Sequence, residues 1–165
     1  MGSDMTEAGA LTTECKNESE SALYTSTSFY IWLRFLREIR AIVWVLAAAC
    51  STAAASSVVS GIDGYKALIA GITLAGVILP GILKAVALDE AIEAYQTQAS
   101  KFKIAEARLR RCADVWSQKP IAEFEAEARA AFAELDEARK FSLTPPEWTF
   151  RNAQKKIKAG HYKPD

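Results

Sequence analysis

The chain has 165 residues, half of them hydrophobic, which is enough for one domain and not obviously for two. Its 20 basic and 20 acidic residues cancel, so no global field predicts binding to a nucleic acid duplex. Three widely spaced cysteines, at positions 15, 50 and 112, match no metal-ligand motif. We therefore predict no metal site, and reduced, idle thiols rather than a redox role.

Residues 1–28 are polar and acidic. They hold five acidic side chains against Lys16, with scattered Ser and Thr and few large apolar residues. Such a composition buries too little apolar surface to offset the entropy lost on folding. We predict a disordered acidic tail, and its start lacks the basic and apolar regions of a secretory signal.

Two uncharged stretches follow, at residues 41–62 and 67–83, joined through the turn sequence GIDGY. At a rise of about 1.5 Å per residue, the first can cross a hydrocarbon core of about 30 Å. The second becomes long enough if Lys84 extends its side chain to the interface. We predict a juxtamembrane segment and two transmembrane helices in residues 29–88, with an ordinary amphipathic soluble helix as the alternative.

The charges that flank these spans predict an orientation. Arg34, Arg37 and Arg40 precede the first span, and Lys84 follows the second. Because positive charge favours the cytoplasmic side, we predict a multi-pass protein of the inner (plasma) membrane with both termini in the cytoplasm. The three arginines share one helix face within FYIWLRFLREIR, where they can reach lipid phosphates.

Small residues recur at four-residue intervals in both spans. The stripe in the first span becomes hydroxylated toward its outer end and consists of Ala48, Thr52, Ser56 and Ser60. It has two interpretations: packing inside the hairpin, or the lining of a pore in a homo-oligomer. The second span is expected to pack against another helix through Ala67, Gly71 and Ala75. It is also expected to bend because of Pro80.

Residues 89–165 are expected to form a cytosolic helical domain. An apolar seam with a mean spacing of 3.5 residues runs from residue 88 to residue 116. No helix breaker separates it from the second span, so we expect one continuous helix. Pro120 opens the next helix, whose matching seam occupies residues 121–141.

Charge favours antiparallel pairing of these two helices. The second carries six acidic residues, whereas the first is basic over Lys101, Lys103, Arg108, Arg110 and Arg111. Opposite charges select a partner more than they stabilise it, because an exposed pair contributes only about 0–1 kcal/mol. The basic segment is therefore either a solvated or acid-paired face, or a site that binds an anionic signal nucleotide.

A short last helix is predicted after TPPEW. Thr144 and Glu147 have the spacing of a capping box, and Gly160 is placed to end the helix. The predicted fold class is therefore all-α. It consists of a transmembrane helical hairpin that continues into a cytosolic antiparallel helical hairpin plus a short C-terminal helix.

Residues that could support catalysis are scarce. The single histidine, His161, lies near the C-terminus with no cysteine or serine motif beside it. The glycines of GITLAGVILPG lie within an apolar run, and no phosphate-binding Lys-Ser/Thr pair follows them. We therefore predict neither an enzyme nor a cofactor.

The order of parts resembles the SLATT domains, two-transmembrane effectors associated with nucleotide-sensing proteins in bacterial defence islands. The resemblance covers about Phe29 to Tyr162 and includes the segments AYQTQASKFK, FAELDEARKF and TPPEW. It implies a homo-oligomeric membrane effector of CBASS-type anti-phage abortive defence, which permeabilises the inner membrane as a pore or ion channel. A cyclic oligonucleotide or a sensor protein would trigger it through the cytosolic helices. The alternative is a passive membrane-anchored scaffold whose coiled hairpin docks a partner enzyme.

Overall fold

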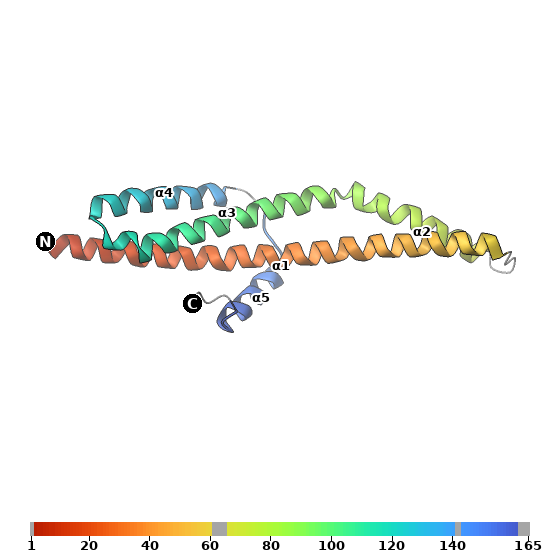
Figure 1. Ribbon diagram of the computed structural model, residues 1–165, viewed down its shortest axis with the longest axis horizontal. Helices are drawn as coiled ribbons and strands as arrows, with labels where there is room; N and C mark the ends of the chain where they lie inside the picture. Colours follow the sequence, from red (N-terminus) through yellow and green to blue (C-terminus); the bar gives the residue numbers. More distant parts are fainter. Residues whose placement is uncertain (1, 61–65, 141–142, 162–165) are drawn as a thin grey trace. The chain divides into compact units, whose positions relative to one another are not determined.

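A computed structural model describes the backbone of residues 2–60, 66–140 and 143–161, and the side chains of residues 7–52, 70–140 and 143–161. Within these ranges the chain is helical and contains no strand, which confirms the predicted all-α class (Figure 1). In chain order the elements are α1 (Gly2–Ser60), α2 (Lys66–Ala85), α3 (Leu88–Asp114), the 3-10 helix η2 (Trp116–Gln118), α4 (Ile121–Arg139) and α5 (Glu147–Lys158).

The chain divides into two compact units. Unit 1 comprises Met1–Trp32 and Ala94–Asp165, and unit 2 comprises Leu33–Glu93. Both α1 and α3 therefore contribute residues to each unit. The division differs from the predicted one, which separated residues 1–28 from the C-terminal helices.

The prediction of a disordered acidic tail was wrong, because residues 2–28 belong to the first half of α1. Cys15, Ala22 and Ser26 are buried there, and the Glu18 carboxylate pairs with Arg139 of α4. Together with Phe29, these positions follow a heptad spacing, which places one face of α1 against its neighbours, and Thr27 and Ser28 are buried as well. Small side chains allow this close packing although each contributes little apolar surface, so composition alone missed it.

The core of unit 1 centres on aromatic contacts between α1 and α3. The Phe29 ring is 2% exposed, and its centroid lies 5.9 Å from that of Tyr95 and 5.8 Å from that of Phe102. Aromatic pairs at this separation bury much apolar surface and add specific ring-edge attraction. The other large buried side chains of this core are Leu109, Phe124 and Leu135.

The predicted antiparallel pairing of α3 and α4 is confirmed. In the first half of α3, Gln98 donates from Nε2 to the carbonyl of Ala138 in the last turn of α4. Near the end of α3, Arg108 donates from Nε to Glu127 Oε1 at 2.8 Å. Most positions of the two predicted seams are buried, namely Leu88, Ile92, Ala99, Phe102, Ala105, Leu109 and Cys112 in α3, and Phe124, Ala128, Ala131, Leu135 and Ala138 in α4.

The last helix, α5, differs from the prediction at its start and agrees with it at its end. Pro146 is the N-cap residue, and no side chain caps the helix, so the predicted box between Thr144 and Glu147 does not form. Gly160 has a φ of 83° just after the helix, a left-handed conformation that glycine adopts without a Cβ clash. The predicted C-terminal cap is therefore confirmed.

The predicted continuous helix between the second span and the cytosolic seam is interrupted. α2 ends at Ala85, α3 begins at Leu88, and Ala87 between them has a φ of 50°. This left-handed conformation costs a non-glycine residue about 1–2 kcal/mol. Because neither glycine nor proline stands at the break, the local sequence gave no signal for it.

We predict that Phe29→Ala lowers the free energy of unfolding by about 3–5 kcal/mol, because it opens a cavity in the unit 1 core. The matched control is Tyr30→Ala on the same helix, since Tyr30 is 44% exposed and its loss should cost less than about 1 kcal/mol. Thermal unfolding in detergent, followed by circular dichroism, measures both. Equal losses for the two variants would contradict the packing of α1 in unit 1.

Candidate functional site

Unit 2 exposes large apolar side chains on both of its long helices. Those on α1 and α2 lie within segments that carry no charged residue over residues 41–52 and 70–83. Soluble proteins rarely expose contiguous apolar patches of this kind without a partner or a membrane. The exposed residues are Ile42, Trp44, Val45, Leu46, Leu74, Val77, Ile78 and Ile82.

Charged side chains border this apolar surface. Arg40 of α1 pairs with Asp89 of α3 through Nη1 and Oδ1 at 2.8 Å. Nearer the start of α1, Arg34 pairs with Glu38 along the helix at 2.9 Å, and Arg37 is exposed. Arg34 and Arg40, both predicted to contact lipid phosphates, therefore have carboxylate partners within unit 2.

The length of the apolar segments can be compared with that of a bilayer core. Among the described residues, no single helix is both long and apolar enough to cross a membrane. One pair meets the criterion of length and composition together, Ala70–Ala85 with Leu88–Gln118, which are bent by 41°. The two predicted spans also include residues 53–62 and 67–69, whose side chains lie outside the described part.

The helices of unit 2 approach each other closely at Gly76 of α2. A Cβ atom built there would lie 3.2 Å from Ser51 Oγ, 3.3 Å from Cys50 Cβ and 3.4 Å from the Ala47 carbonyl oxygen. The Ser51 hydroxyl already donates to the Ala47 carbonyl at 2.9 Å, so it is held in place. A Cβ atom here would be crowded against α1, so glycine favours the close approach of the two helices at this point.

The predicted small-residue stripe of α1 does not lie at this contact with α2. Ala48 and Thr52 are exposed, so neither packs inside the hairpin of unit 2. The Thr52 hydroxyl donates to the carbonyl of Ala48 at 2.9 Å, which satisfies it without water. Ser56 and Ser60, the other two members of the stripe, have side chains outside the described part.

Only some of the small residues predicted to pack the second span are partly buried within unit 2. Gly71 is exposed, and a Cβ there would meet nothing within 4 Å. Ala75, beside Gly76, is half-buried, and Pro80 is half-buried inside α2. The side chain of Ala67 lies outside the described part. Spacing therefore predicted the helix correctly, but it selected Gly71 and not Gly76, where the contact with α1 is observed.

The basic segment of α3 is largely paired with acids. Arg108 bonds Glu127 and Glu134 of α4, while Lys103 and Arg110 flank the buried Glu106 at 2.8 and 3.5 Å. The hydrogen bond from Arg108 is the main cause that lowers the pKa of Glu127, and Arg111 lowers it further. Lys101 is half-buried and Arg111 is exposed. The five residues therefore favour the acid-paired interpretation over an open anion site.

All three cysteines are free, and two of them lie in the core of unit 1. Burial raises the pKa of the Cys15 thiol to about 11, and nearby Cys112 adds to the shift. Burial also raises the pKa of Cys112. Within the described residues, no three His, Cys, Asp or Glu side chains gather closely enough to hold a metal ion.

Comparisons of the chain with known protein families, with curated proteins and with solved structures found no match.

We predict that Gly76→Leu destabilises unit 2 by about 1–3 kcal/mol, because the new side chain must displace α1 at Ser51 and Cys50. Gly71→Leu is the matched control, since it adds the same side chain to the same helix where nothing obstructs it. Thermal unfolding in detergent compares the two variants. A Gly71→Leu loss as large as that of Gly76→Leu would show that helix propensity or solvation, and not contact with α1, sets the effect.

Proposed function

We propose that the chain is a membrane effector whose unit 2 inserts into the inner membrane, where copies of the chain assemble and permeabilise the bilayer. The observation that carries this proposal is the exposed apolar surface of unit 2. Large side chains such as Trp44, Val45 and Val77 project from helices that are uncharged over residues 41–52 and 70–83. Such a surface is unfavourable in water and favourable in lipid.

The contrast with unit 1 supports the proposal. Unit 1 exposes charged side chains and joins its helices with ion pairs, including those of Arg108 and Arg139. The arginines at residues 34, 37 and 40, together with Lys84, lie at the ends of the uncharged segments. This distribution favours a transmembrane hairpin with both termini in the cytoplasm, where unit 1 would receive the signal.

Assembly is needed because two helices cannot enclose a channel. The exposed face of Ala48 and Thr52 has small side chains, which allow another copy to approach closely. The resemblance to SLATT domains supports a role in anti-phage abortive defence, with a cyclic oligonucleotide or a sensor protein as the trigger. Because Arg108 is engaged by Glu127 and Glu134, a trigger that bound there would have to displace these two carboxylates of α4.

We predict that Val77→Lys reduces membrane insertion, because a charge near the centre of a span costs about 2.5–3.5 kcal/mol. Val77 is 71% exposed, so the same change would be tolerated on the surface of a soluble protein. The matched control is Ile104→Lys in unit 1, where the replaced side chain is 62% exposed. Carbonate extraction and flotation with vesicles measure the inserted fraction. A wild-type chain that does not float would overturn the membrane assignment.

We predict that the wild-type chain releases dye from anionic vesicles, alone or with the trigger, and that Thr52→Leu changes the rate at least about threefold with insertion retained. Leucine adds bulk to a small, exposed position that neighbouring copies or water would contact. The control, Ala49→Leu, adds similar bulk at an exposed position of α1 outside the stripe. Normal insertion with no dye release under any condition would contradict the effector and favour the anchored scaffold.

A further inference from the structure

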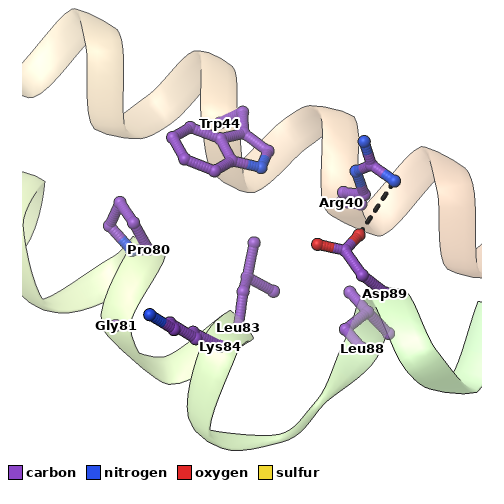
Figure 2. Close-up of a pocket in the computed structure, with 8 residues that line it drawn as sticks. All are labelled: Arg40, Trp44, Pro80, Gly81, Leu83, Lys84, Leu88 and Asp89. Atoms are coloured by element: carbon purple, nitrogen blue, oxygen red, sulfur yellow. Dashed lines mark ion pairs between the residues drawn. The ribbon is translucent and has the colours of Figure 1, made fainter.

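Unit 2 contains a groove of about 390 Å³ where α1 passes the end of α2 and the start of α3. This volume lies within the range of about 300–1,000 Å³ that is typical of small-molecule sites. Figure 2 shows Trp44 and Arg40 projecting from α1 toward the other two helices, with the Leu83 side chain rising between them. The lining residues are Arg40, Trp44, Pro80, Gly81, Leu83, Lys84, Leu88 and Asp89.

The groove exists because the chain is interrupted after α2. Pro80 has no backbone N–H to donate within α2, and the left-handed Ala87 redirects the chain before α3. This change of direction brings Leu88 and Asp89 to the groove, where Asp89 meets Arg40 at 2.8 Å. In an uninterrupted helix, Leu88 and Asp89 would continue in the direction of α2. The groove therefore depends on the break at Ala87.

The lining combines an apolar wall with an excess of positive charge. Trp44, Pro80 and Leu83 form the apolar part. Two cations, Arg40 and Lys84, and one anion, Asp89, leave a net charge of +1. Asp89 is already neutralised by Arg40, whereas Lys84 has no ion-pair partner in the described part of the chain. The groove therefore has an unused cation beside an apolar surface, which matches a molecule with an anionic head and an apolar tail.

We infer that this groove binds an anionic glycerophospholipid. The phosphate lies at Lys84, and the first part of an acyl chain lies along Trp44, Pro80 and Leu83. A lipid is favoured over a free phosphate because the apolar wall would gain nothing from an inorganic ion. The assignment rests on the membrane location proposed above for the source of the lipid, since Lys84 stands at the end of an uncharged segment.

Binding is tested on the full-length chain in detergent, with phosphatidylglycerol whose acyl chains are brominated, because bromine quenches tryptophan fluorescence on contact. We expect saturable quenching, with brominated phosphatidylcholine binding at least about tenfold more weakly. Trp44→Phe, which keeps an aromatic ring in the wall, should remove the saturable part. Quenching that is equal for the two lipids, or unchanged in Trp44→Phe, would overturn the assignment.

Lys84→Gln should weaken phosphatidylglycerol binding about tenfold, because it removes the cation proposed to bind the phosphate. Lys119→Gln is the control: it removes one charge from an exposed lysine that does not line the groove, and binding should stay within about twofold. Equal effects of the two variants would overturn the site. Inorganic phosphate should not displace the lipid, and displacement at millimolar phosphate would reassign the groove to a free phosphate.

The two experiments can reject the lipid site and the membrane effector independently of each other. Phosphatidylglycerol binding in detergent, by a chain that does not float with vesicles, would retain the groove and reject the membrane effector. A chain that inserts and releases dye but binds both lipids equally would reject the groove alone.

Discussion

Close packing of small side chains is the constraint on which both units depend. In unit 1, alanines such as Ala105 and Ala128 are fully buried between helices, and in unit 2, Gly76 meets α1 at Ala47 and Ser51. Small residues let helix axes approach, so backbone and Cβ atoms make contacts that larger side chains would prevent. They also bury little apolar surface each, which leaves the stability of unit 1 dependent on a few large rings such as Phe29.

Charge is used differently in the two units. Unit 1 pairs its charges across helices, and the Arg108 bonds that lower the pKa of Glu127 also fix the register of α3 against α4. Unit 2 has ion pairs at Arg34 and Arg40, and it exposes large apolar side chains along its uncharged segments, such as Trp44, Val45 and Val77. A chain with no net charge thus contains one part suited to water and one part suited to an apolar solvent, which the total composition concealed.

Periodic patterns predicted the helices well, and the errors arose where no local signal existed. The seams of α3 and α4 were predictable because large apolar residues mark them at heptad spacing. The first half of α1 follows the same spacing through Cys15, Ala22 and Ser26, but side chains of this size do not distinguish a packed face from a polar tail. The break at Ala87 was not predictable, because tertiary contacts impose a conformation that alanine does not favour. Likewise, spacing could not decide between Gly71 and Gly76, since only the partner helix distinguishes them.

These contacts reduce the possible roles of the stripe of small residues on α1. Packing inside the hairpin is excluded for Ala48 and Thr52, because both are exposed while Ala47 and Ser51 meet α2. The Thr52 hydroxyl also does not require water as a hydrogen-bond acceptor, since it donates to the Ala48 carbonyl of its own helix. In the proposed membrane assembly, this face is therefore best suited to contact a second copy of the chain, where small side chains permit close approach. In such an assembly, the face of Ala48 and Thr52 would line a pore only where neighbouring copies move apart. The same face would then contact another copy in the closed state and line the pore in the conducting state.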